Sequence, residues 1–160
     1  MKRRVVVTGI GALTPIGNNV NDTWKGILNH QCGIDLIQSF DTSNMKVKVA
    51  GELKNFEATE YLDKKDVRKM DKFIQYGLIA AKEAIKDSKL EIDSINHDRF
   101  GVVVSSGIGG LGSIEENHQR GLKKGFDRVS PYFIPMTIVN LAAGQIAIAF
   151  KAQGLATCPV

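Results

Sequence analysis

Cysteine and histidine, which most often bind metals or act as nucleophiles and bases, are scarce in this chain. Its 160 residues include two cysteines, Cys32 and Cys158, and three histidines, His30, His97 and His118. The cysteines lie far apart without a Cys-x-x-Cys spacing, and the histidines do not have the spacing of metal ligands. We therefore expect reduced thiols and no metal site.

Long apolar runs are also missing. No stretch approaches the roughly 20 consecutive apolar residues that cross a bilayer. The apolar run near the N-terminus covers only Val5 to Val7, which is too short for a signal peptide. These absences predict a cytoplasmic protein that does not bind membranes.

Charge of one sign is not in large excess either. The formal net charge is +4, with 43% hydrophobic and 24% charged residues, as in an ordinary globular protein. The length fits one domain over residues 1–160. A mild positive excess favours an acidic partner only where basic residues cluster. Because aromatic residues do not interleave with the basic ones, we expect no nucleic-acid partner.

Basic residues do cluster between Lys64 and Lys72. If one helix begins early in this segment, positions 65, 68, 69 and 72 share a face. Asp63, just before this stretch, and Asp66 and Asp71 within it balance much of the positive charge. The segment is therefore either a solvated helix face or a docking surface for an acidic partner.

Glycine, in contrast, is plentiful, and it gathers after one predicted strand. The β-branched run 102–104 is followed by two serines and then by four glycines between Gly107 and Gly112. Glycine has no Cβ, so that backbone or ligand can approach it closely. The turn could therefore cradle a phosphate, or it could pack closely against another segment and line a narrow cavity.

The same glycine turn matches the G-x-G-x-x-G pattern of dinucleotide sites. Such a site needs an acidic residue at the end of the next strand. Asp127 has the right spacing from Gly107 but lies in a predicted loop. An earlier glycine loop, 9–17, has Thr14 where the third glycine is needed. We predict no nucleotide site and no cofactor.

Hydrophobic periodicity predicts alternating strands and helices. We expect strands at 3–8 (buried), 46–50 (half-exposed), 102–104 and from 155 onward, a short helix capped by Asn21 or Asp22 and ended by Gly33, an amphipathic helix ending near Ser88, and an apolar helix from Pro135 or Thr137 to about Lys151. The last helix is apolar on nearly all sides, which indicates deep core or a subunit interface.

Several short motifs follow one another along nearly the whole chain: RRVVVTGIG (3–11), TPIGN (14–18), KMDKFIQY (69–76), SGIGGL (106–111), EEN (115–117), and SPYFIP with TIVN (130–135 and 137–140). Together, and in this order, they resemble the β-ketoacyl-acyl-carrier-protein synthases of fatty-acid synthesis, most closely the type II condensing enzymes. The resemblance implies an α/β, thiolase-like fold with αβαβα layers, built from two related halves. This chain would supply most of the first half.

The resemblance also implies a decarboxylative Claisen condensation. A cysteine takes an acyl group from acyl carrier protein, and two histidines help malonyl-carrier lose CO2 and attack the acyl-enzyme. The family places its nucleophile just after the strand that begins near Leu155, so we expect the catalytic cysteine and both histidines beyond Val160. Cys158 is followed by Pro159 and lacks a glycine turn into a helix, and it is therefore expected to be a packed thiol. The 160 residues alone are predicted to be inactive.

Other roles implied by the resemblance fall on this chain. Ile108 is expected to line the acyl tunnel, and Phe133 is expected to reach a pocket at the dimer interface, with plain core packing as the alternative for both. The apolar helix 137–150 is expected at the interface of a homodimer. Docking of acyl carrier protein is expected at four basic residues: Lys65, Arg68, Lys69 and Arg128.

Two further interpretations stay open. The chain ends inside a predicted strand, which suggests truncation, and it could be a non-catalytic fragment that only dimerises or binds a carrier protein. Alternatively, the complete protein could be a polyketide ketosynthase, or a chain-length factor that lacks the cysteine.

Overall fold

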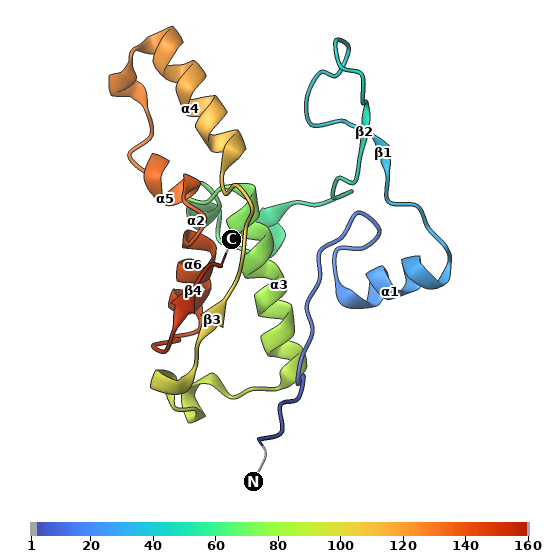
Figure 1. The fold of residues 1–160 in the computed structure, drawn as a ribbon, viewed down its shortest axis with the longest axis vertical. Helices are drawn as coiled ribbons and strands as arrows, with labels where there is room; N and C mark the ends of the chain where they lie inside the picture. The colour runs from blue at the N-terminus through green and yellow to red at the C-terminus, as the bar shows by residue number, and fades with distance from the viewer. Residues whose placement is uncertain (1–2, 160) are drawn as a thin grey trace. The chain divides into compact units, whose positions relative to one another are not determined.

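The computed structural model describes residues 3–159, which separate into two compact units (Figure 1). Within the described residues, unit 1 comprises 3–57 and Ala80–Leu90, and unit 2 comprises Ala58–Ile79 and 91–159. The long helix α3 (Lys72–Ser88) supplies its first turns to unit 2 and its last turns to unit 1. Its predicted end near Ser88 is confirmed.

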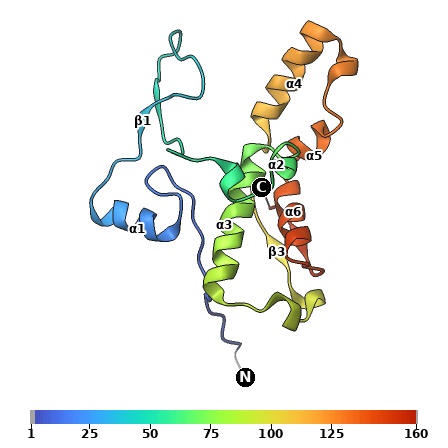
Figure 2. The same ribbon diagram turned by 180° about the vertical axis from the view of Figure 1, so that it is seen from behind.

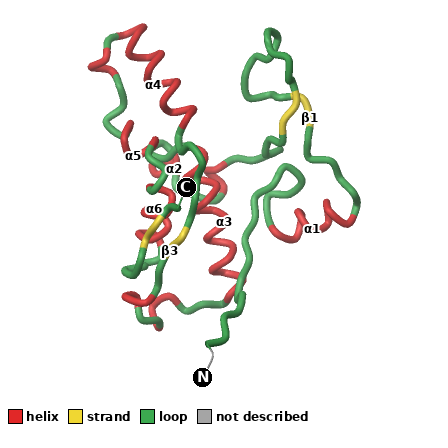
Figure 3. The backbone as a smooth tube through the Cα atoms, viewed as in Figure 1, coloured by secondary structure: helices red, strands yellow, loops and turns green. Residues whose placement is uncertain are grey.

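Unit 1 consists largely of loops around two short regular elements (Figure 3). One is the helix α1 (Val20–Leu28), and the other is an antiparallel pair of strands, β1 (Asp35–Leu36) and β2 (Val49–Ala50). In this pair Asp35 lies opposite Ala50, and Leu36 lies opposite Val49. The strand predicted at 46–50 is therefore present but much shorter.

The cap of α1 differs from the sequence-based prediction. Asn19, not Asn21 or Asp22, precedes the helix, and its side-chain oxygen accepts a hydrogen bond from the Asp22 amide at 2.8 Å. The helix ends at Leu28, well before Gly33, and His30 follows with a φ of +54°. Any of several neighbouring Asn and Asp side chains can cap a helix, so composition alone does not choose among them.

The glycine loop at 9–17 packs directly on the C-terminal turns of α3. A Cβ at Gly11 would lie 1.9 Å from the carbonyl oxygen of Ala80. The Glu83 carboxylate accepts hydrogen bonds from the amides of Ala12 and Val20, each at 2.9 Å. Small residues on the helix thus admit the backbone of the loop, and the Glu83 carboxylate accepts from N–H groups that the loop would otherwise leave unpaired.

The buried strand predicted at 3–8 is wrong. The segment is irregular, and Val5, Val6 and Val7 are 92%, 58% and 80% exposed. A strand requires a hydrogen-bonded neighbour, and this segment pairs with none of the strands in the described residues. The valine run shows strand propensity, but propensity does not supply a partner.

Unit 2 is built around a parallel pair of strands, β3 (Val102–Val103) and β4 (Ala156–Thr157). Helix α6 (Leu141–Ala149) packs against both strands (Figures 1 and 2). The other helices of the unit are α2 (Lys64–Val67), α4 (Leu111–Lys124) and α5 (Phe133–Thr137), with 3-10 turns η1 (Ala58–Glu60), η2 (Ile92–Ser94), η3 (His97–Arg99) and η4 (Phe126–Arg128). The strands expected at 102–104 and after 155 are both confirmed.

The core of unit 2 joins three elements. Helix α3 contributes Ile74 and Leu78, which are buried one helical turn apart. Val102 of β3 and Ile146 of α6 are also buried. Ile148, on another side of α6, is exposed. One apolar side of α6 therefore packs in the core, and none of the described residues covers the other apolar side.

The single apolar helix predicted from about 137 to 151 is wrong, because it breaks between α5 and α6. The Thr137 carbonyl, which would accept from Leu141 in a continuous helix, accepts a hydrogen bond from Gly110 at 3.0 Å. Leu141 donates instead to Ile138, whose backbone is extended. A tertiary hydrogen bond thus replaces a helical one.

The basic segment is likewise not one helix. Helix α2 ends at Val67, and α3 begins at Lys72. The amides of Ile74 and Gln75 donate to the Asp71 carbonyl oxygen, each at 3.1 Å, so Asp71 starts a new helix. The prediction that positions 65, 68, 69 and 72 share one helix face is therefore wrong.

Within residues 3–159, none of the helices combines the length and the apolar content that crossing a bilayer requires.

Candidate functional site

The glycine turn after β3 is closely packed and already hydrogen-bonded. Gly109 donates its N–H to Ser106 Oγ, and Gly110 donates to the Thr137 carbonyl, both at 3.0 Å. A Cβ at Gly109 would lie 2.3 Å from Thr137 O, and one at Gly110 would lie 2.3 Å from Met136 O. Of the two interpretations left open by the sequence, the structure supports the close-packed turn, because these N–H groups are engaged by the protein and not free for a phosphate.

A carboxylate occupies the N-terminus of α4, which follows this turn. Asp71 Oδ2 accepts hydrogen bonds from Ser113 N at 3.1 Å and from Ser113 Oγ at 2.6 Å. Asp71 Oδ1 accepts from Phe73 N of α3 at 3.3 Å. One side chain therefore caps two helices, and its negative charge lies where an anionic ligand would have to bind.

Helix α4 buries small and polar residues on one face. Ser113, Asn117 and Gly121 are buried at four-residue spacing. Asn117, only 3% exposed, donates to the Ser113 carbonyl at 2.8 Å and accepts from the Ser130 amide at 2.9 Å. Phe126 covers Gly121, where a Cβ would meet its ring at 2.5 Å. The segment 126–133 is thereby held on α4.

An apolar cavity of about 450 Å³ lies between α4 and this segment. Its lining residues are Ile114, Asn117, His118, Phe126, Val129 and Phe133. A cavity of this size and lining suits part of an apolar chain. Phe133, the substrate residue expected from the sequence, is one of its walls.

Ile108, the other expected substrate residue, is placed differently. It is 65% exposed at the tip of the glycine turn and does not line this cavity. The structure therefore does not bring Ile108 and Phe133 into one cavity within the described residues. The walls from α4 were not predicted from the sequence, although Ile114, Asn117 and His118 have the i, i+3, i+4 spacing of one helix face.

The four basic residues expected to dock a carrier protein are all exposed. Lys65 lies in α2, Arg68 and Lys69 follow it, and Arg128 ends η4. Lys69 Nζ lies 3.9 Å from Asp66 and 5.8 Å from the centre of the Tyr132 ring. This cation–π geometry brings the α2 segment beside the loop that follows η4.

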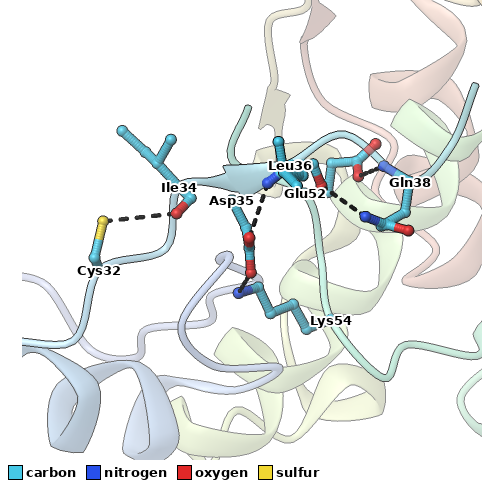
Figure 4. Close-up of polar contacts among 7 residues, drawn as sticks. All are labelled: Cys32, Ile34, Asp35, Leu36, Gln38, Glu52 and Lys54. Atoms are coloured by element: carbon cyan, nitrogen blue, oxygen red, sulfur yellow. Dashed lines mark hydrogen bonds and ion pairs between the residues drawn. The ribbon is translucent and has the colours of Figure 1, made fainter. Parts of the chain in front are cut away.

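A second cavity, also of about 450 Å³, lies in unit 1 beside β1 and β2. Figure 4 shows that its polar groups already bind one another: Lys54 Nζ contacts Asp35 Oδ2 at 2.9 Å, and Glu52 accepts from Gln38 N at 2.7 Å. The hydrogen bonds to Asp35 from Lys54 and from the Leu36 amide lower the pKa of its carboxyl. Because these groups are exposed and mutually paired, this cavity is a weaker candidate.

Both cysteines are free thiols. Cys32 is exposed, and its Sγ contacts the Ile34 carbonyl at 3.8 Å (Figure 4). Cys158 is half-buried directly after β4. In the described part of the chain, no group of three or more His, Cys, Asp or Glu side chains is arranged to hold a metal ion.

Comparison with known protein families decides the relationship of the chain. Residues 2–160 match the model of the N-terminal domain of β-ketoacyl synthases. The chain belongs to this family. The resemblance found in its glycine, Ser-Pro-Tyr-Phe and Lys-Met-Asp-Lys motifs is thereby confirmed over essentially the whole length.

Curated relatives are similar at about half of the aligned positions. The chain is 52% identical over 147 residues to 3-oxoacyl-[acyl-carrier-protein] synthase 2 of Vibrio cholerae, covering 92% of this chain and 36% of that protein. It is 49% identical over 152 residues to the protein of the same name from Staphylococcus aureus, covering 95% and 37%. The chain thus spans little more than a third of these relatives.

Solved structures confirm the expected fold class. The ishigamide ketosynthase/chain length factor superposes with a TM-score of 0.88 at 24% identity, covering 99% of this chain and 40% of that one. A type II PKS acyl-carrier protein in complex with its ketosynthase bound to the hexaketide (AntDE:AntF) gives 0.77 at 28% identity, covering 96% and 42%. The chain therefore has the fold of one portion of a thiolase-like ketosynthase.

The close packing of the glycine turn predicts different outcomes at two neighbouring glycines. Gly110→Ala should reduce the free energy of unfolding by about 2–3 kcal/mol, because the new methyl group meets the Met136 carbonyl. Gly112→Ala, with open space around its Cβ inside α4, should be neutral or stabilising by about 0.5–1 kcal/mol. Urea unfolding of both variants measures the difference, and equal destabilisation would contradict the assigned packing.

Proposed function

We propose that the full-length protein carries out the elongation step of fatty-acid synthesis, as a 3-oxoacyl-[acyl-carrier-protein] synthase. The observation that carries this proposal is the identity of about 50%, over more than nine-tenths of this chain, to relatives with that name. Because the chain spans little more than a third of those relatives, activity, substrates and partners belong to the whole protein.

The chemistry runs in two transfers. A cysteine thiolate attacks the acyl thioester and the carrier thiol leaves, which gives an acyl-enzyme. Malonyl-carrier then loses CO2, its enolate carbon attacks the acyl carbonyl, and the cysteine thiolate leaves. The product is a 3-oxoacyl carrier. We place the nucleophilic cysteine and the two histidines beyond Val160, so Cys158 takes no part.

This chain contributes binding surfaces to that reaction. Lys65, Arg68, Lys69 and Arg128 form a basic surface that fits an acidic carrier protein, because exposed cations raise the encounter rate with an anionic partner. Phe133 and the apolar cavity on α4 receive part of the acyl chain. Ile108 lies outside that cavity, at the glycine turn, and borders a separate stretch of the acyl tunnel.

We further propose a homodimer in the cytoplasm. The exposed apolar side chains of Ile134, Ile138 and Ile148 on α5, α6 and their connection support an interface there. The interface expected on one helix at 137–150 is therefore proposed on the two shorter helices α5 and α6.

The decisive experiment incubates the full-length protein with acyl carrier protein loaded with an acyl group and measures the intact protein mass. We expect an increase equal to one acyl group, which is lost when malonyl-carrier is added and a 3-oxoacyl carrier forms. A protein that takes up no acyl group would leave the non-catalytic or chain-length-factor interpretation. Acceptance of polyketide-length starters alone would favour the polyketide ketosynthase.

The basic surface predicts a carrier-specific effect. Lys65→Glu with Arg68→Glu should raise KM for carrier-bound substrate about tenfold or more, and the parent should lose affinity as salt increases, because screening shortens the reach of exposed charges. Lys48→Glu with Lys86→Glu makes the same change in net charge elsewhere and should leave KM near the parent value. Identical KM values for both double variants would assign the cluster to a solvated face.

The pocket role of Ile108 predicts a change in chain-length preference. Ile108→Phe should narrow the acyl tunnel at the glycine turn and lower kcat/KM for long acyl chains at least tenfold more than for short ones. Val47→Phe adds a ring at an exposed position of unit 1 and serves as the control. Equal losses across a series of acyl-carrier lengths would argue against a pocket role.

A further inference from the structure

Asp71 links the basic segment, proposed to dock the carrier protein, to helix α4, which lines the proposed acyl cavity. In the chain it ends the basic segment that carries Lys65, Arg68 and Lys69. In space its carboxylate binds Ser113 through both the amide, at 3.1 Å, and the hydroxyl, at 2.6 Å. The basic segment is thereby tied to the first turn of α4.

Helix α4 connects Ser113 to the apolar cavity through Asn117. Asn117, one turn after Ser113, holds the Ser130 amide at 2.9 Å and also lines the apolar cavity. Phe133, three residues after Ser130, forms another wall of that cavity. The basic segment and the pocket are therefore joined by hydrogen bonds along one buried face of α4.

We propose that Asp71 is a positioning residue that sets the basic docking segment in register with α4, so that carrier docking and the acyl pocket are aligned for transfer. The proposal rests on the proposed function. The Asp71 carboxylate binds Phe73 and Ser113, and in this proposal it acts only through the residues that it holds.

The chemistry of the contact explains why a carboxylate is needed. Asp71 accepts from N–H groups at the first turns of α3 and α4, where partial positive charge favours an anion. A carboxylate has two acceptor oxygens, whereas an asparagine amide has one acceptor and one donor. With Asp71→Asn, one of the two helix starts would face an NH2 group, and the link would loosen.

Asp66 provides a matched comparison in the same segment. Its carboxylate is 3.9 Å from Lys69 and, within residues 3–159, makes no hydrogen bond or ion pair to α4. Asp66→Asn and Asp71→Asn both remove one negative charge beside the basic residues. Electrostatics alone therefore predicts a lower KM for acyl carrier protein in both variants, whereas loss of register predicts a higher KM for Asp71→Asn only.

The experiment uses the full-length protein and two acyl donors, acyl carrier protein and the small thioester acyl-pantetheine. For Asp71→Asn we expect KM for acyl carrier protein to rise roughly tenfold, as for a lost contact of a charged group. The maximal rate of acyl-enzyme formation from acyl-pantetheine should stay within about twofold of the parent. Asp66→Asn should leave both values unchanged or lower KM.

Ser113→Ala keeps the experiment informative if Asp71→Asn does not fold. It removes the hydroxyl bond to Asp71 but keeps the bond from the Ser113 amide, so we expect a smaller KM rise, about threefold, for the carrier substrate alone. An unchanged or lowered KM in the folded variants, or equal losses with both donors, would overturn the positioning role. An inactive parent would instead overturn the proposed function.

Discussion

The hydrogen bonds of the Asp71 carboxylate join the start of α3 to the start of α4 in unit 2. They end the basic segment, begin α3 and cap α4. The glycine turn can then lie against the end of α5, where Gly110 takes the carbonyl of Thr137 that a continuous helix would have used. The break between α5 and α6 is thus a consequence of this packing.

In both units a glycine turn lies directly against the backbone of a helix, because glycine has no Cβ to keep the two apart. In unit 1 the loop at 9–17 lies on α3, where Gly11 leaves no room for a Cβ. In unit 2 the turn at Gly109 and Gly110 lies against α5. The protein supplies acceptors for amide hydrogens in both places: the Glu83 carboxylate in unit 1, and the Ser106 hydroxyl and the Thr137 carbonyl in unit 2. No nucleotide phosphate is needed to satisfy these groups.

Much of the fold was predictable from local pattern. The amphipathic helix to Ser88, the strand at Val102–Val103 and the final strand follow from periodicity and β-branched runs. The segment at 3–8 has an equally strong pattern but no paired neighbour in the described residues, so pattern alone misplaced it. Phe133 lies beside an apolar cavity, and its role in binding an acyl chain stays a prediction. The walls that α4 contributes to this cavity required the folded structure.

By itself the sequence determined the family, because residues 2–160, which contain the ordered motifs, match the model of the β-ketoacyl synthase N-terminal domain. It also determined which residues carry exposed charge. Only the tertiary structure decided that Asp71 caps two helices and that Asn117 holds the Ser130 amide. It also decided that the Thr137 backbone occupies the space beside Gly109. These contacts join residues distant in sequence, and no local pattern encodes which acceptor a buried donor will reach.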